Sequence, residues 1–310
     1  MRAAALTEFG AAPDLTELDV REPAEGEVRL HVHAASVNGF DLAVANGYLK
    51  DMMEHHFPLV LGKDFAGTVD AVGPGVTGFA PGERVFGVDA KAHLGEGSFA
   101  EFVTVPAAMG IAKLPDSVTF TEGAALGLAG CAALSAFEAC GPRTGQSVLV
   151  AGATGGVGTQ VVQLAAQAGA HVIATAHTDQ ERAYVGDLGA AEVVDYRGDV
   201  AAAVLQSHPQ GVDAVIHLAG DPSALLAAVR DGGKFISTLI GSAEQLASQS
   251  ATVLPVSASP TTANLARVAD NQATGHTRVK IQRVYGLQGT AEALTDFTGG
   301  TLGKLVITTT

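Results

Sequence analysis

The sequence predicts an α/β protein with a β-rich first domain followed by a doubly wound parallel-sheet domain. Three observations predict this class. The residues before Pro115 hold short strand-like runs separated by Gly and Pro, and those after it alternate between strand-like and helix-like runs. Residues 148–158, Val-Leu-Val-Ala-Gly-Ala-Thr-Gly-Gly-Val-Gly, join an apolar strand to a glycine-rich turn and a helix. That order offers backbone N–H groups and a positive helix end to a diphosphate, so we expect a nucleotide site there.

The first domain is expected to be a small, irregular β-barrel. Alternation of apolar and polar residues predicts strands at 28–35 and 99–105, and short apolar runs predict strands at 68–72 and 84–88. Strand-like pieces recur near the end of the chain, at 279–284 and 305–308, and are expected to return to this domain. The predicted domains are therefore 1–118 with 278–310, and 119–277.

The second domain is expected to begin with an apolar helix at 122–139. Strands are then predicted at 147–152, 171–176, 192–195, 212–218 and 233–240, and helices at 156–168, 179–188, 199–206 and 222–230. This alternation implies a parallel sheet with right-handed crossovers.

Charge and composition narrow the partners of the protein. The 310 residues carry a formal net charge of −14, which disfavours nucleic acid and anionic membranes. The two cysteines, Cys131 and Cys140, lie nine residues apart in a predicted helix and so on roughly opposite faces, which disfavours a disulfide between them. Without a Cys-x-x-Cys pattern they predict no structural zinc site. The longest apolar run, 124–137, is too short to span a bilayer, and the first residues turn polar too early for a signal peptide. We expect a soluble, cytoplasmic protein.

The glycine-rich turn provides the first candidate site residues. Gly155 lets the backbone approach a pyrophosphate, and Gly158 lets the helix pack against the strand. A strict G-x-G-x-x-G pattern would place its first glycine at Ala153. The cofactor-binding residues expected in this turn are Ala153, Thr154, Gly155, Gly156, Val157 and Gly158.

The end of the next strand bears on the choice of cofactor. NAD sites place Asp or Glu there, whereas this chain has Ala176-His177-Thr178. His177 and Arg182 are candidates to meet the 2′-phosphate of NADPH, which favours NADPH over NADH. The alternative is that Arg182 is a solvated helix charge.

Several motifs in order carry a family resemblance. They are Val37-Asn38-x-Phe40-Asp41, Pro58-x-x-x-Gly62-x-Asp64-x-x-Gly67, Pro81-Gly82-Glu83-Arg84-Val85-Phe86-Gly87, Gly97-Ser98-Phe99-Ala100-Glu101 and the turn 153–158. In order and spacing they resemble the medium-chain dehydrogenase/reductase superfamily, in its zinc-free quinone oxidoreductase branch. The resemblance implies a GroES-like domain, a Rossmann domain, a nicotinamide in the cleft between them, and a homodimer.

The resemblance also implies chemistry without metal. At the positions of the zinc ligands of zinc-dependent relatives this chain has Asn38, Lys63 and Leu128, and neither an ammonium nor an alkyl group binds Zn²⁺. The expected function is hydride transfer from NADPH to a quinone. The alternatives are a reductase of α,β-unsaturated ketones or aldehydes (enones), and a non-catalytic NADPH-binding sensor. A zinc alcohol dehydrogenase would require stoichiometric metal.

Four residues are candidates for the catalytic side of the site: Asn38, Asp41, Tyr48 and Lys63. Asn38 either donates to an acceptor oxygen or caps the following turn. Asp41 is expected to orient its neighbours, and Tyr48 to supply a proton or pack against the acceptor. Lys63 either forms a structural pair with Asp64 or polarises a substrate carbonyl.

The remaining cofactor candidates lie at strand ends. The resemblance places Tyr196 in the 2′-phosphate pocket. Leu218, Ala219, Leu239 and Ile240 end two predicted strands, where the ligand crevice of such sheets lies. His217, beside them, is expected to be a structural histidine.

Overall fold

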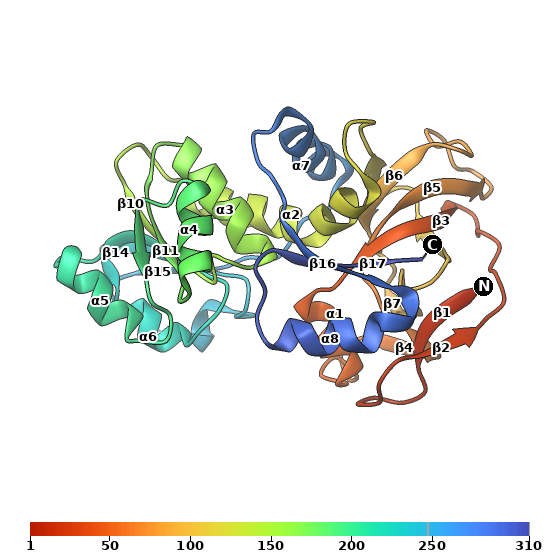
Figure 1. Cartoon of the computed structure of the whole chain (residues 1–310), viewed down its shortest axis with the longest axis horizontal. Helices are drawn as coiled ribbons and strands as arrows, with labels where there is room; N and C mark the ends of the chain where they lie inside the picture. The colour runs from red at the N-terminus through yellow and green to blue at the C-terminus, as the bar shows by residue number, and fades with distance from the viewer. Residues whose placement is uncertain (247, 310) are drawn as a thin grey trace. The chain divides into compact units, whose positions relative to one another are not determined.

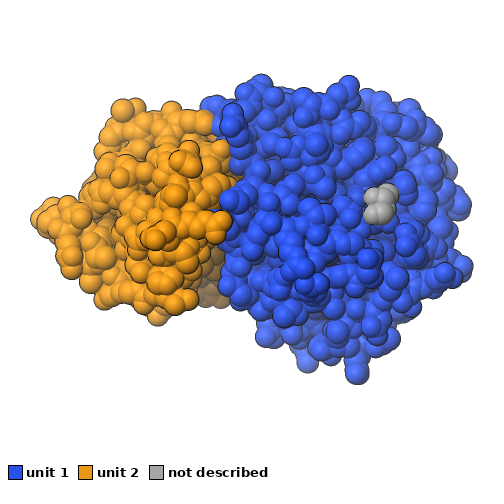
Figure 2. Space-filling view, in the orientation of Figure 1, with its two compact units in different colours: residues 1–131, 260–310 blue, residues 132–259 orange. Residues whose placement is uncertain are grey.

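The computed structural model describes residues 1–246 and 248–309 and divides into two compact units. Unit 1 comprises Met1–Cys131 and Pro260–Thr310, and unit 2 comprises Ala132–Ser259 (Figure 2). The division falls inside helix α2 (Phe120–Cys140), and helix α7 (Thr262–Thr274) belongs to unit 1. Both boundaries differ from the predicted 118/119 and 277/278, because the first turns of α2 and all of α7 pack with the β-rich unit.

Unit 1 contains two β-sheets (Figure 1). The larger runs in the order β16 (Ile281–Gly286), β17 (Lys304–Thr308), β3 (Glu27–Ser36), β5 (Asp64–Val72), β6 (Arg84–Val88), β9 (Ile111–Lys113), with β8 (Phe102–Pro106) also paired to β3. The smaller runs β2 (Asp14–Glu17), β1 (Arg2–Leu6), β4 (Glu54–Val60), β7 (His93–Glu96). Helices α1 (Gly39–Ala45) and α8 (Thr290–Thr298) belong to the same unit, together with α7 and the first turns of α2.

The C-terminal strands join the first sheet, as expected. β17 pairs antiparallel with β3, with Val306 opposite Ser36. The alternating sequence of β3 buries Val28, Leu30 and Val32 in a core with Phe65 of β5. This pairing brings the last strand of the unit to residues near position 36.

Unit 2 is built on a six-stranded parallel sheet, which confirms the predicted α/β class. Its order is β12 (Glu192–Val194), β11 (His171–Thr175), β10 (Ser147–Ala151), β13 (Val212–His217), β14 (Val229–Ser237), β15 (Thr252–Pro255). The intervening helices are α3 (Gly156–Gln167), α4 (Asp179–Asp187), α5 (Val200–Ser207) and α6 (Pro222–Leu226). Short 3-10 turns lie at Ala243–Gln245 in this unit and at Leu287–Gly289 in unit 1.

The strand order reverses direction between β10 and β13. In numbers along the sheet the order is third, second, first, fourth, fifth, sixth, which is the arrangement that binds dinucleotides at the reversal. A nucleotide site is therefore expected at the carboxyl ends of β10 and β13.

Helix α2 is the most apolar element of the chain. By length and composition alone, the 21-residue helix could cross a membrane. The apolar run 124–137, on which the sequence-based expectation depends, is shorter than the helix. In the fold, 72% of its most apolar window is buried, as in the core helix of a globular protein.

Candidate functional site

The glycine-rich turn between β10 and α3 is tightly packed. A Cβ at Gly158 would lie 2.1 Å from the carbonyl oxygen of Gly152, so only glycine lets α3 approach β10 this closely. Gly152 itself has φ +90°, in the left-handed region that glycine favours. Sequence reasoning assigned the packing role to Gly158 but missed Gly152, although a glycine directly after an apolar strand is a turn signal.

The turn is held to the ends of both neighbouring strands. The Gly152 N–H donates to Thr175 Oγ1 at 2.9 Å, at the end of β11, and the Leu218 N–H donates to Ala151 O at 2.9 Å, after β13. Among the described residues no side chain caps the N-terminus of α3 and none in its first turn is acidic. The N–H groups of that turn are therefore suited to an anion, and the residues present fit a dinucleotide diphosphate.

A charged cluster lies beyond the ends of β11 and β12. His177 Nδ1 lies 2.9 Å from Asp195 Oδ2, and Arg182 Nη2 lies 3.6 Å from the same oxygen. Arg182 Nε also donates to His177 O at 3.2 Å. Tyr196 Oη donates to Glu181 Oε1 at 3.3 Å. The structure thus brings together the three residues predicted for the adenosine end, but it adds two carboxylates to them.

Asp195 is the residue that sequence reasoning missed here. It follows β12 directly, and its pKa is lowered first by the N–H of Arg197 and then by His177. The end of β11, on which the predicted cofactor choice depends, has no carboxylate. The adjacent parallel strand, β12, ends at the same edge of the sheet. A carboxylate directly after that strand is the sequence signal that indicates Asp195.

The strand ends of β13 and β14 form a neutral hydrogen-bonded corner. His217 is buried, with Nε2 3.1 Å from Gly220 O and Nδ1 2.8 Å from Ser237 Oγ. Because a carbonyl only accepts, Nε2 carries the proton and Nδ1 accepts from the Ser237 hydroxyl. Ser237 Oγ in turn accepts from the N–H groups of Leu239 and Ile240. Burial lowers the pKa of His217, which agrees with the structural role expected for it.

The predicted cofactor residues Leu218, Ala219, Leu239 and Ile240 lie in this corner. A Cβ on Gly152 would come within 3.1 Å of the Leu218 and Ala219 side chains, so the glycine turn and the end of β13 are in close contact. Ser237 positions Leu239 and Ile240 by accepting from their N–H groups, and His217 holds the Ser237 hydroxyl.

Unit 1 contains a buried polar network centred on Asp64, the first residue of β5. Asp64 Oδ2 accepts from Ser36 Oγ at 2.6 Å and from Asn38 Nδ2 at 2.9 Å, and lies 3.6 Å from Lys304 Nζ. Lys304 Nζ also donates to Asn38 Oδ1 at 2.6 Å and to Val37 O at 2.9 Å. The Asp64 side chain has no exposed surface and that of Lys304 is 4% exposed.

Asn38 is fully engaged by this network. Its amide nitrogen donates to Asp64 and, at 3.3 Å, to Ser36 O, and its amide oxygen accepts from Lys304. Both amide protons therefore have protein partners. Asn38 occupies the N-cap position of α1 and its N–H donates to the Asp41 side chain, while its side-chain amide is held by the network.

Asp41 adds a second buried carboxyl group. Its Oδ2 accepts from the Asn38 N–H at 2.8 Å. Burial raises its pKa to about 7, against the opposing effects of that hydrogen bond and of Lys304 and Lys63. Burial also lowers the pKa of Lys304. In this network the buried ammonium of Lys304 thus interacts with two carboxyl groups, those of Asp41 and Asp64.

The expected pairing of Lys63 with Asp64 is wrong. In the part of the chain that the structure describes, the cation paired with Asp64 is Lys304, and the Lys63 ammonium lies 5.1 Å from the centre of the Phe40 ring. Lys63 precedes the first residue of β5, and its ammonium is directed at the Phe40 ring. Lys304, 240 positions further along, was not predicted.

The positions matched to zinc ligands converge on this network. Asn38 donates to Asp64, the Leu128 N–H donates to Asp64 Oδ1 at 2.7 Å, and Lys63 is its chain neighbour. Lys63 and Asp41 also line one cavity of about 20 Å³, enough for a water molecule. Tyr48 does not line that cavity and is 76% exposed.

Two family models match the chain. Residues 24–116 match the alcohol dehydrogenase GroES-like domain, and residues 156–262 match the zinc-binding dehydrogenase domain. The first match lies within unit 1 and covers the motifs from Asn38 to Glu101. The second begins at the glycine turn.

Curated relatives include two plant proteins. The chloroplast envelope quinone oxidoreductase homolog of Arabidopsis thaliana is 36% identical over 66% of this chain and 62% of its own length. The chloroplastic quinone-oxidoreductase homolog of Spinacia oleracea is 31% identical over 70% of this chain and 68% of its own length. The chain thus spans less than two thirds of the Arabidopsis relative.

Solved structures match the whole chain. The quinone oxidoreductase of Coxiella burnetii is 26% identical with a TM-score of 0.89, covering 100% of this chain and 99% of that one. An NAD-dependent alcohol dehydrogenase is 28% identical with a TM-score of 0.88, covering 100% of both chains. A mycobacterial protein complexed with NADPH is 29% identical with a TM-score of 0.86, covering 99% of both.

Proposed function

The chain belongs to the medium-chain dehydrogenase/reductase superfamily and is quinone oxidoreductase-like, and from this we propose that it transfers hydride from NADPH to a quinone without zinc. Its similarity to quinone oxidoreductases of plants and of Coxiella supports the reaction class. Membership of the family does not by itself specify the electron acceptor, the cofactor or whether zinc is used, and these three properties are proposed for this chain.

The observation that carries the metal-free proposal is the Lys304 ammonium in the Asp64 network. Of the three positions that match zinc ligands, Asn38 and Leu128 hydrogen-bond to Asp64 and Lys63 precedes it in the chain. Their side chains are an amide, an alkyl group and an ammonium. Such donors do not fit Zn²⁺. Lys304 already supplies a positive charge beside Asp64, and a zinc ion there would be repelled by it.

Without a Lewis acid, the substrate must accept hydride readily by itself. An alcohol needs its alkoxide stabilised, whereas a quinone is an activated acceptor that becomes aromatic on reduction. This supports quinone reduction over alcohol oxidation.

The nucleotide side of the proposal depends on unit 2. When bound, NADPH supplies the hydride. The first-turn N–H groups of α3 would hold its diphosphate, and Arg182, His177 and Tyr196 would meet the adenosine 2′-phosphate. Asp195 opposes binding of the 2′-phosphate, because its carboxylate already forms an ion pair with Arg182. This ion pair favours the alternative cofactor, NADH.

On the acceptor side, Asp41 and Lys63 are the proposed proton-handling groups. They line the same small cavity, and with a pKa of about 7 Asp41 can both hold and release a proton near neutral pH. Asn38 and Lys304 would hold Asp41 in place without touching the substrate. A role for Tyr48 as proton donor stays a prediction, as do the cytoplasmic location and the homodimer.

Steady-state oxidation of NADPH with a panel of acceptors tests the function. We expect turnover with benzoquinone or naphthoquinone, unchanged by prior treatment with a strong zinc chelator. Higher kcat/KM with an enone than with either quinone would move the assignment to the enone reductases. Tight NADPH binding without turnover of any acceptor would support a sensor, and stoichiometric catalytic zinc would revive the alcohol dehydrogenase hypothesis.

A further inference from the structure

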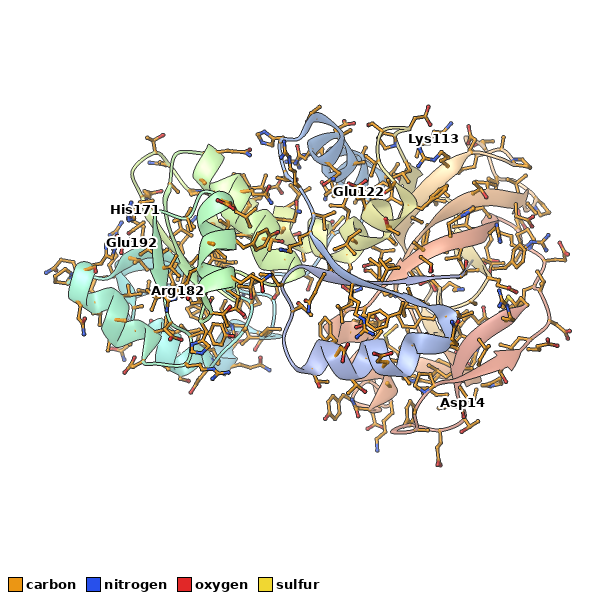
Figure 3. The ribbon with its side chains drawn as sticks, in the orientation of Figure 1. Asp14, Lys113, Glu122, His171, Arg182 and Glu192 are labelled. Carbon is orange, nitrogen blue, oxygen red and sulfur yellow. The ribbon has the colours of Figure 1, made fainter. Side chains whose placement is uncertain are left out.

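Two imidazoles and a carboxylate converge at the end of the unit 2 sheet opposite the glycine turn. His171 is the first residue of β11, Glu192 is the first of β12, and His208 is the C-cap of α5. His171 Nε2 lies 2.6 Å from Glu192 Oε1, and His208 Nε2 lies 3.1 Å from the same oxygen. Figure 3 labels His171 and Glu192 on their neighbouring strands.

The geometry of the cluster suits a small divalent cation. One ligand atom from each residue lies within 4.8 Å of the other two. Zinc bound at roughly 2.0–2.1 Å from imidazole and carboxylate donors keeps them about 3–3.5 Å apart in a tetrahedral site. The 3.1 Å separation of His208 from Glu192 lies in that range, whereas the 2.6 Å separation of His171 from Glu192 is shorter, so binding requires these two side chains to move apart. Two histidines and one carboxylate are a donor set that transition metals favour.

The electrostatic surroundings also favour a cation. Within the described residues, 1–246 and 248–309, the ion pairs of Glu192 are with His171 and His208 and not with a Lys or Arg. His208 ends α5, and the last carbonyls of a helix carry partial negative charge. The three side chains are 21–40% exposed, so an ion can reach them from solvent.

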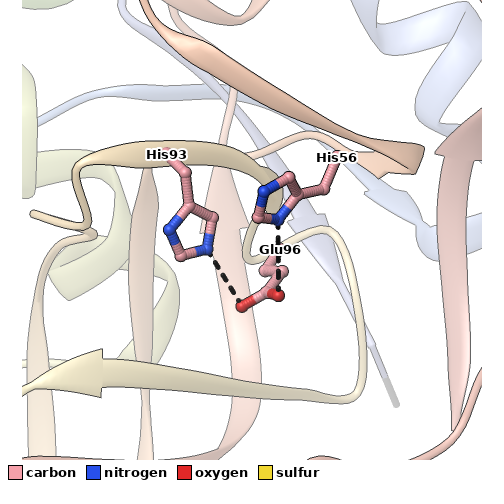
Figure 4. Close-up of side chains that lie close together, drawn as sticks. All are labelled: His56, His93 and Glu96. Carbon is pink, nitrogen blue, oxygen red and sulfur yellow. Dashed lines mark ion pairs between the residues drawn. The ribbon is translucent and has the colours of Figure 1, made fainter.

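A second cluster in unit 1 provides a contrast. His56, His93 and Glu96 also bring their ligand atoms within 4.8 Å of one another (Figure 4). Glu96, however, already forms ion pairs with Arg21 and with Lys91, whose Nζ lies 3.6 Å from Oε2. A divalent cation there would face two positive side chains at close range, which disfavours binding.

We propose that His171, Glu192 and His208 form a binding site for Zn²⁺ or a similar divalent transition metal. The ion would cross-link β11, β12 and the end of α5. The site lies at the amino ends of the strands, whereas nucleotides bind at the carboxyl ends. It is therefore a stabilising or regulatory site, separate from the proposed hydride transfer.

Zinc binding to the full, untagged chain tests the proposal. After removal of metals, the protein competes for Zn²⁺ with a chromophoric chelator. We expect wild type to bind one equivalent, and the His171→Ala/His208→Ala variant to bind at least about tenfold more weakly, because loss of a ligand costs more than loss of an outer-shell contact. The matched control, His56→Ala/His93→Ala, removes the unit 1 cluster and should retain wild-type affinity.

Two further measurements keep the test decisive if the double variant folds poorly. Glu192→Gln preserves the shape of the carboxyl group and should also lose affinity. In wild type, Zn²⁺ should raise the Tm and release protons as the imidazoles bind. The proposal is overturned if wild type binds no Zn²⁺, if folded Glu192→Gln binds as wild type does, or if only His56→Ala/His93→Ala loses the ion.

Discussion

Arg182 donates to the His177 carbonyl and forms an ion pair with the Asp195 carboxylate. The proposed preference for NADPH over NADH depends on how strongly these two contacts hold the arginine. An arginine already paired with a carboxylate attracts a 2′-phosphate less than a free one. The pair is exposed, so solvent screens it and the effect on affinity is modest.

We predict opposite effects of two substitutions in this pair. Arg182→Ala should raise the KM for NADPH more than that for NADH. Asp195→Asn should lower the KM for NADPH roughly threefold, because the arginine is released while the shape of the side chain is kept. Steady-state kinetics with both cofactors measures this. Equal changes for NADPH and NADH in Arg182→Ala would show that the arginine is a surface charge.

Asp41 makes stability depend on pH near neutrality. Its pKa rises from 3.8 to about 7 on folding, so the folded state binds the proton more tightly. Its contribution to the free energy of unfolding is fully present below about pH 4 and is lost as the pH rises through about 7.

Asp41→Asn should remove this dependence. Between about pH 5 and pH 7 the wild type should lose up to about 1.4 kcal/mol of stability per pH unit relative to the variant. Urea unfolding at several pH values measures the difference. Asp51→Asn, at an exposed carboxylate, should follow the wild type. Parallel pH profiles for wild type and Asp41→Asn would refute the assignment.

The β10–turn–α3 element shows how one missing Cβ controls a binding site. Gly158 lies against the backbone of Gly152, so any side chain there forces the helix away from the strand. The N–H groups that are suited to a diphosphate would move with the helix.

Gly158→Ala should therefore weaken both stability and NADPH binding. We expect a loss of about 1–3 kcal/mol, from overpacking, and a higher dissociation constant for NADPH by calorimetry. Gly186→Ala, in α4, has open space around the added Cβ and should be neutral or slightly stabilising. Unchanged NADPH affinity in a folded Gly158→Ala would contradict the site.

At the scale of elements, the alternating unit was predictable and much of the β-rich unit was not. The expected strands and helices of 147–218 lie close to those observed, because their apolar runs are bounded by clear turns. Helix α6 is shorter than expected, because β14 already begins at Val229. The sequence analysis did not identify α7, although Thr261 caps its start and Gly275 ends it in the left-handed conformation.

One candidate site could likewise be predicted from the sequence, and the other could not. The glycine turn is local in sequence, and its residues were predictable. The Asp64–Lys304 pair joins residues 240 positions apart, and it depends on β17 lying against β3 and β3 against β5. Strand pairing of this kind leaves no local pattern, so Lys304 could not be found from sequence alone.

Lys304 also couples the last strand to the stability of all of unit 1. Lys304→Met would leave Asp64 without its buried counter-ion and would remove the donor to Asn38 Oδ1 and Val37 O. We expect a loss of about 3–5 kcal/mol, as for removal of one partner of a buried ion pair. Urea unfolding measures it.

The matched control is Lys113→Met, which removes an exposed ammonium paired with Glu83. Its stability should stay close to wild type. A Lys304→Met protein as stable as Lys113→Met would show that the network tolerates loss of its cation.

At the scale of the whole molecule, unit 2 is inserted between two segments of unit 1, and the second segment carries β17 and Lys304. During translation the ribosome therefore completes unit 2 before the sheet of unit 1 has its β17 strand or Asp64 its counter-ion. A nascent chain interrupted before residue 304 would hold a finished unit 2 and an incomplete unit 1 with an uncompensated internal charge. Chaperones and proteases act on such products.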